Sequence, residues 1–300
     1  MRLFVIGLLA LSGMAWAAPD LKDSYESLKD AVEKKDVAKV KSLAGQTAKE
    51  AKELAAEAQP SAAGEVEAWK GRQQFAKDAE SYSEYALAVT ASQATDPAVT
   101  IELTEALIAQ DPKSESIDTA APAYLAALGK GGSAKVIAGA NKIVAGRPEN
   151  EDALYALASN SLSSAPGQAL TAANRLVAAM GKKKKPEGMN DADWEKRKTA
   201  MIGAGYTFAG VVQGAQNRFA EADRSLKAAL PLIAGNSTML SYAYYYLGLS
   251  NFQMGKLTSD RSKMVAGTQF TDKAAATAGP MQAQAANNSA VMKREMASAR

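Results

Sequence analysis

Apolar residues in the first part of the chain recur every three or four positions, which is the spacing of one face of an α-helix. One stripe consists of Leu21, Tyr25, Leu28 and Val32. A second stripe begins directly after Asp36, whose carboxylate can cap the new helix. The pattern therefore predicts a helical hairpin that ends near Pro60, and a third helix that starts after Ser61.

Proline punctuates the rest of the chain at regular intervals. Asp96 and Pro97 have the pattern of a cap followed by the first residue of a helix. From there Pro112, Pro148 and Pro186 recur roughly every 36 to 38 residues, a period typical of stacked helical hairpins. Because we find no run of alternating apolar and polar residues, the sequence predicts an all-α fold without a sheet.

Two segments carry a more specific pattern. The sequence YTFAGVVQGAQNRFAEADRSLKAAL starts at Tyr206, and YYYLGLSNFQMGK starts at Tyr244. Both resemble the tetratricopeptide repeat, a helical hairpin of about 34 residues with a Leu-Gly pair in its first helix, an Ala and an aromatic or large residue in its second, and a Pro after it. The resemblance implies a right-handed superhelical solenoid over 96–279. It also implies packing roles for Leu157, Gly210, Ala222, Leu247 and Gly248.

The second of these segments holds two stripes. One carries the repeat pattern, and the other consists of Tyr242, Tyr245, Leu249 and Phe252. In the family, this second stripe lines a concave groove that holds a partner, and the equivalent upstream positions include Tyr155, Ser159 and Thr207. The alternative is that the aromatic side chains pack beneath a neighbouring repeat or beneath 257–279. The Lys and Asn clamp that some members use for an acidic C-terminus is absent, which favours a mixed aromatic and polar groove for an extended or helical segment.

The ends of the chain differ from its middle. Residues 1–17 combine a basic start, an apolar stretch and a small-residue exit, the pattern of a secretory signal peptide cleaved after Ala17. A membrane anchor is the less favoured interpretation, because the apolar stretch is shorter than the roughly 20 residues that span a bilayer. The remainder divides into an N-terminal helical region over 18–95, the repeats with a capping helix over 96–279, and a frayed or disordered tail over 280–300. We therefore expect a periplasmic or secreted protein.

Composition limits the chemistry. The chain of 300 residues has neither His nor Cys, which removes His-dependent nucleophilic catalysis and the usual zinc and iron ligands. A formal net charge of +3 argues against nucleic acid as the partner. The exception is the run Lys182–Lys185, which is either a solvated loop or a site for an acidic surface. We find no phosphate-binding loop, and no cofactor or metal is expected.

These observations favour a non-catalytic scaffold of the bacterial cell envelope, which binds a protein or peptide segment in the concave groove of the array. Self-association through the array is a further interpretation. The alternative function is a periplasmic enzyme or carrier that acts on cell-envelope material through a carboxylate-based site. An acid pair facing a pocket would favour that alternative.

Overall fold

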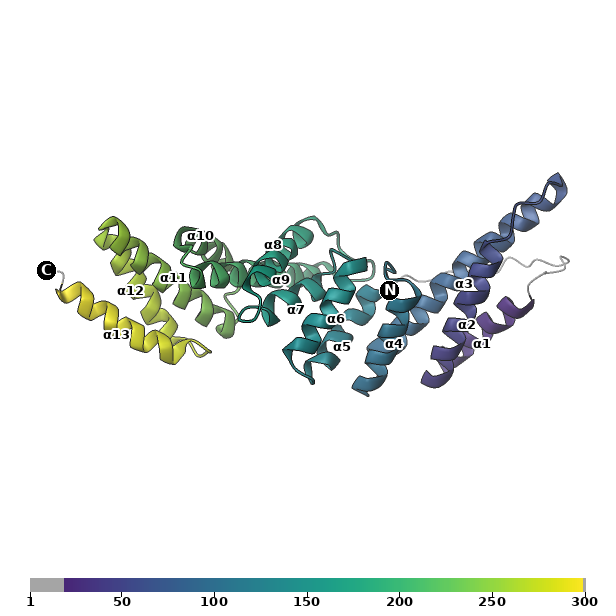
Figure 1. Cartoon of the computed structure of the whole chain (residues 1–300), viewed down its shortest axis with the longest axis horizontal. Coiled ribbons are helices and arrows are strands. Elements are labelled where there is room, and N and C mark those ends of the chain that lie inside the picture. The colour runs from purple at the N-terminus through teal and green to yellow at the C-terminus, as the bar shows by residue number, and fades with distance from the viewer. Residues whose placement is uncertain (1–18, 299–300) are drawn as a thin grey trace. The chain divides into compact units, whose positions relative to one another are not determined.

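The computed structural model describes residues 19–298, and these residues form thirteen α-helices and no strand (Figure 1). Within 19–146 and within 166–298, helices that follow one another in the chain pack against one another. The all-α class predicted from the sequence is therefore confirmed. The chain divides into two compact units, one ending at Asp152 and the other beginning at Ala153. This division lies inside the region predicted to hold the repeats.

The N-terminal unit contains the first six helices and a 3₁₀ turn over Ala63–Glu65. The helices are α1 (Pro19–Glu33), α2 (Val37–Ala55), α3 (Val66–Gln93), α4 (Pro97–Gln110), α5 (Ile117–Gly129) and α6 (Ser133–Gly146). Two predicted caps are present. Asp36 accepts a hydrogen bond from the backbone nitrogen of Lys39 at 3.2 Å, and Asp96 accepts one from Ala98 at 2.9 Å.

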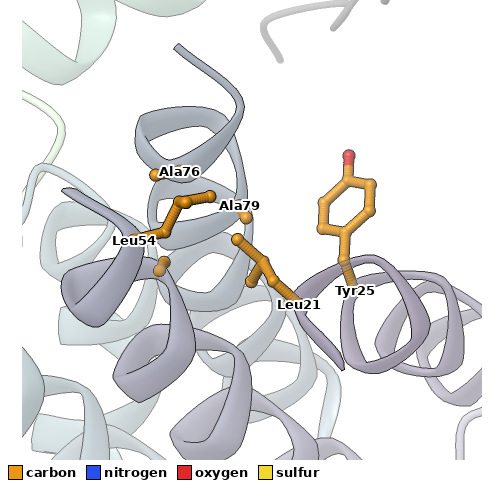
Figure 2. Close-up of a cluster of buried hydrophobic side chains, with 6 residues drawn as sticks. Leu21, Tyr25, Leu54, Ala76 and Ala79 are labelled. Carbon is orange, nitrogen blue, oxygen red and sulfur yellow. The ribbon is translucent and has the colours of Figure 1, made fainter. Parts of the chain in front are cut away.

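A buried cluster joins α1, α2 and α3. Leu21 and Tyr25 on α1 meet Leu54 on α2 and the small residues Ala76 and Ala79 on α3 (Figure 2). The ring of Tyr25 lies edge-on to Phe75 and Tyr82, with centroids 5.6 and 5.2 Å away. Burial of this cluster raises the pKa of Tyr82 to about 12. The first hairpin is thus held on α3 by apolar and aromatic contacts.

A polar network joins the next three helices. The hydroxyl of Tyr124 on α5 donates to Glu105 on α4 at 2.5 Å, and Lys142 on α6 donates to the same carboxylate at 2.6 Å. Burial alone would raise the pKa of Glu105, but these two donors and the charge of Lys142 bring it below its ordinary value. One carboxylate therefore links α4, α5 and α6.

The C-terminal unit begins within α7 (Glu151–Asn160) and includes a 3₁₀ turn over Leu230–Leu232. Its other helices are α8 (Pro166–Lys182), α9 (Asp191–Ala215), α10 (Phe219–Ala229), α11 (Ser237–Thr258), α12 (Arg261–Ala276) and α13 (Gln282–Ser298). Helix α9 packs against α8, α10 and α11, and α11 packs against α10 and α12. Each helix of the α9–α10 pair therefore contacts the pair that follows.

Glycine allows α11 and α12 to approach closely. A Cβ atom added to Gly248 would lie 2.9 Å from the backbone nitrogen of Thr271, and one added to Gly267 would lie 2.5 Å from that of Phe252. Both distances are shorter than the contacts that Cβ atoms make in folded proteins. The side chains of Thr271 and Met264 would also meet a Cβ at Gly248 and at Gly255. We call this contact line the glycine seam.

The five residues given packing roles by the resemblance are all buried. Leu157, Ala222 and Leu247 are at most 3% exposed, and Gly210 and Gly248 are buried as well. Gly210 faces the side chain of Leu226 on α10. Helices α9 and α10 therefore meet at a small residue, as α11 and α12 do.

The tail after Pro280 differs from its prediction. Instead of a frayed or disordered segment, residues 282–298 form α13, which packs against α12. Ala285 is fully buried, and Ser289 donates to Asp272 on α12 at 2.5 Å. Small residues here give little hydrophobic signal in the sequence, but they let α13 lie close enough to bury its backbone.

Candidate interaction groove

Three of the seven residues predicted to line a partner groove are in the interior. Thr207, Tyr245 and Phe252 are 0, 5 and 3% exposed. Tyr245 packs against Ala274 and Ala285, and its hydroxyl accepts a hydrogen bond from Asn288 on α13 at 3.1 Å. Tyr245 and Phe252 on α11 are covered by α13 and α12, and Thr207 is buried on α9, where its hydroxyl donates to the carbonyl of Gly203. These three side chains are therefore not available to a partner.

The other four predicted groove residues are half-buried. Tyr155 lies edge-on to Phe208 with centroids 5.4 Å apart, and the Ser159 hydroxyl donates to the carbonyl of Ala156 at 3.3 Å. Tyr242 and Leu249 are on α11. The structure does not bring these four into the lining of any cavity described below.

A groove with a volume of about 760 Å³ lies in the N-terminal unit between α2 and α4, with α3 beneath it. Two lysines of α2 cross to α4. Lys41 forms an ion pair with Glu102, and Lys52 donates to the carbonyl oxygen of Gln110 at 3.2 Å. Because the partners follow the same order along both helices, α2 and α4 run in the same direction. Figure 1 shows both helices beside α3.

The groove is open because the apolar part of its lining consists mostly of glycine and alanine. On α2 the lining positions fall on one face, at the spacing that brings residues of a helix together. The apolar lining consists of Gly45, Ala48, Ala56, Leu87, Ala106 and Ala109. Leu87 of α3 is 1% exposed and Ala48 is 3% exposed, so they form the floor. A Cβ added to Gly45 would meet nothing within 4 Å. The apolar surface of the groove therefore consists mainly of methyl groups and backbone, with Leu87 in its floor.

Charged side chains stand along one rim of this groove. The charged residues of the lining are Lys41, Lys49, Lys52 and Glu53, all on α2. Lys49 is the most exposed of them at 77%, and its ion pair with Glu53 is long at 3.8 Å. Exposed pairs of this kind contribute little to stability, so they exchange at small cost. Each of the three lysines lies within ion-pair distance of a carboxylate, from Glu102, Glu53 and Glu80 respectively, so the charges at the rim are balanced.

Gln110 fixes one end of the groove. Its carbonyl oxygen accepts from Lys52, and its side-chain amide donates to the hydroxyl of Ser83 on α3 at 2.7 Å. Nearby, Glu84 accepts a hydrogen bond from Ser114 at 2.6 Å, and burial raises the pKa of Glu84. Neither Ser83 nor Glu84 lines the groove. These two hydrogen bonds therefore join α3, beneath the groove, to the C-terminal end of α4 and the residues that follow it.

Two smaller cavities lie among α11, α12 and α13 in the C-terminal unit. Their volumes are about 260 and 530 Å³, and both are lined by Arg261 and Met296. Their remaining charged lining is mixed, with Lys256, Lys293 and Glu295. They are smaller than the groove and lack its continuous apolar floor.

Within residues 19–298, no three acidic side chains converge as ligands for a metal ion. In the same range, every helix is too short or too polar to span a lipid bilayer. The signal peptide predicted over residues 1–17 lies outside the described residues. Comparison of the chain with protein-family models finds no match, and comparison with curated proteins finds none either.

Sequence reasoning missed the groove. Its signal is the stripe Lys41, Gly45, Ala48, Lys49 and Lys52 on a single helix face. Such a stripe of small residues is also the pattern of a close helix contact, as at the glycine seam. Which of the two applies depends on whether another helix lies across the stripe.

Proposed function

We propose that this protein is a non-catalytic scaffold that binds a segment of another protein. The observation that supports the proposal is the groove between α2 and α4, with its apolar floor and its lysine rim. Concave, mostly apolar sites with a few polar groups at the edge are typical of binding sites. The proposal assigns the partner to the N-terminal unit, because Tyr245 and Phe252 of the α11 stripe are buried.

The proposal includes the finer fold suggested by the sequence. Helices 9 to 12 are two successive hairpins with small residues at their crossings, which is consistent with tetratricopeptide-like repeats in a right-handed solenoid. The leader-like first 17 residues support an envelope location, either periplasmic or secreted. In such arrays each hairpin buries only part of its surface, so a long face is left for partners.

The test is site-specific photo-crosslinking in the envelope of the native bacterium. A photoreactive residue replaces Ala109, which is exposed and lines the groove. The control replaces Ala138, an exposed alanine of α6 outside the groove. We expect one defined protein to be crosslinked from position 109 and not from position 138.

The captured protein is then expressed, and its binding to the purified chain is measured. Ala109→Trp fills the groove and is expected to abolish binding, whereas Ala138→Trp leaves it unchanged. The proposal fails if position 109 yields no crosslink, or if the captured protein binds Ala109→Trp as well as it binds the unmodified chain.

A further inference from the structure

Helix α13 lies beside α12 in the C-terminal unit (Figure 1), and its attachment differs between its two ends. We infer that α13 is a hinged strap, which turns away from α12 about residues 277–281 and uncovers Tyr245 while α9 to α12 stay folded. This inference concerns the C-terminal unit and is independent of the proposed function. It follows from the small number of side chains that α13 buries, from the contacts of the linker before it and from the polar contacts at its far end.

Helix α13 buries few side chains. Of its 17 residues, all of which the structure describes, Ala285, Ser289 and Met292 are buried. Helix α11, with 22 residues, has ten buried positions, and Tyr245 is one of them. Two of the three buried residues of α13 are small, so they gain little from the hydrophobic effect. Elements with few buried apolar contacts open at a lower free energy than the core of the same unit.

The linker between α12 and α13 is fixed to α11. The backbone nitrogen of Met281 donates to the hydroxyl of Ser241 on α11 at 3.1 Å. A Cβ added to Gly279 would lie 2.5 Å from the Cβ of the same serine, so the linker lies directly against α11. The end of α13 that joins this linker is therefore anchored, and residues 277–281 form the pivot.

The far end of α13 is held by two ion pairs. Lys293 pairs with Asp272 on α12 at 2.7 Å, and Glu295 pairs with Lys256 on α11 at 3.0 Å. The four side chains are between 44 and 57% exposed. Ion pairs this exposed contribute little to stability, and salt screens them. They therefore hold the far end of α13 only weakly.

Packing at the far end is incomplete. The cavities of about 260 and 530 Å³ lie there, and Met296 lines both of them. Atoms that face such a space lack protein contacts on that side. The sulfur of Met296 lies 3.4 Å from the hydroxyl of Thr268 on α12, but a thioether is a weak acceptor. The far end is therefore the part of α13 that leaves α12 first.

Tyr245 lies under the first half of α13. Its ring packs against Ala274 and Ala285, and its hydroxyl accepts a hydrogen bond from Asn288. With α13 in place, Tyr245 is 5% exposed. When α13 turns away, Ala285 and Asn288 leave with it, and water reaches both the ring and the hydroxyl. Helix α13 therefore controls access to Tyr245.

Thiol labelling of the full chain tests the inference, because the chain has no cysteine of its own. Ala285→Cys places a thiol on the face of α13 that meets α11 and α12. Ala222→Cys, at an alanine of α10 that is also 0% exposed, is the control. Under native conditions we expect a water-soluble maleimide to label position 285 at least about 100-fold faster than position 222. Circular dichroism checks that both variants fold.

Weakening the far end is expected to speed the labelling. Asp272→Asn removes the charge that pairs with Lys293, and it is expected to raise the rate at position 285 about threefold. Glu221→Gln, which removes an exposed ion pair with Arg218 on α10, is the matched control and is expected to leave that rate unchanged. Raising the salt concentration to about 0.5 M is expected to act in the same direction as Asp272→Asn.

Hydrogen exchange of the unmodified chain, followed by mass spectrometry, gives a measurement that needs no substitution. A helix of this length is marginal in water once it is released, so its amides exchange when the strap opens. We expect the amides of 282–298 to exchange faster than those of 237–258, across the whole of α13.

Equal labelling rates at positions 285 and 222 would overturn the inference, because α13 would then open only when the whole unit unfolds. A rate at position 285 that neither Asp272→Asn nor salt changes would also contradict it, as would equal protection of α13 and α11 from hydrogen exchange. Fast exchange confined to the last turn of α13 would show a frayed end instead of a helix that turns about the linker.

Discussion

Glycine and alanine lie along both the groove and the glycine seam, but they have opposite surroundings. At Gly248 another helix lies so close that a single carbon would meet the backbone of Thr271. At Gly45 and Gly71 nothing lies within reach of an added Cβ. The effect of one methyl group therefore depends on position.

We predict that Gly248→Ala lowers the free energy of unfolding of the C-terminal unit by about 1 to 3 kcal/mol, because α11 and α12 must separate. Gly71→Ala, in the open interior of α3, is the matched control. It is expected to stabilise its helix by about 0.5 to 1 kcal/mol, since alanine restricts the unfolded chain more than glycine does. Urea unfolding followed by circular dichroism measures both. Equal effects of the two substitutions would contradict the close approach at the seam.

The aromatic residues of α11 give a second prediction at the same scale. Tyr245→Ala removes a side chain that is 5% exposed and leaves a cavity against α12 and α13. We expect it to destabilise the protein by about 3 kcal/mol. Tyr242→Ala, at a half-buried position on the same helix, is expected to change stability by less than about 1 kcal/mol. Thermal unfolding measures the stability of both variants. A Tyr245→Ala variant as stable as the unmodified protein would contradict a packing role for Tyr245.

At the scale of elements, one carboxylate holds three helices together. Glu105 accepts hydrogen bonds from Tyr124 and Lys142, and its pKa lies below the ordinary value of 4.5. Because the folded state favours the charged form, the stabilisation is present above pH 4.5. It is lost as the pH falls through the lower folded pKa.

Glu105→Gln is therefore expected to destabilise the N-terminal unit by about 1 kcal/mol at neutral pH, because two donors lose their charged acceptor while water screens a carboxylate that is 36% exposed. The difference from the unmodified protein should shrink as the pH falls below the folded pKa, where both proteins carry a neutral side chain. Thermal unfolding at pH 7 and at acidic pH gives the comparison. A difference that does not depend on pH would mean that the charge of Glu105 has no part in it.

Elements with large apolar stripes, caps or the repeat pattern could be predicted from the sequence, whereas α13 and the groove, which consist of small residues outside that pattern, could not. The stripe from Leu21 and the caps at Asp36 and Asp96 specify helices by themselves. Helix α13 was missed because Ala285 and Ser289 bury little area and acquire their role only against α12. The groove was missed for the same reason. Gly45 and Ala48 form a close helix contact when another helix lies across them, and they line an open groove when none does.

At the scale of the whole molecule, the chain contains two compact units. Each unit has its own close contacts, the Glu105 network in the first and the glycine seam in the second. Cooperative unfolding usually follows such units, and large chains often unfold in more than one step.

We predict that calorimetry resolves two unfolding transitions. Glu105→Gln is expected to lower the temperature of one transition, and Gly248→Ala that of the other. A single transition that both substitutions shift by similar amounts would show that the whole chain unfolds as one cooperative body.

The small apolar residues that line the groove have a consequence for the evolution of any partner. Methyl groups and backbone impose no contour that distinguishes leucine from isoleucine or methionine, so exchanges among these residues in the bound segment would be nearly neutral. Specificity would then depend on the polar side chains at the edges of the groove, which are Lys41, Lys49, Lys52, Glu53 and Gln110. Such a site would bind ligands that differ in their apolar residues with similar affinity, and would distinguish ligands mainly by their polar residues.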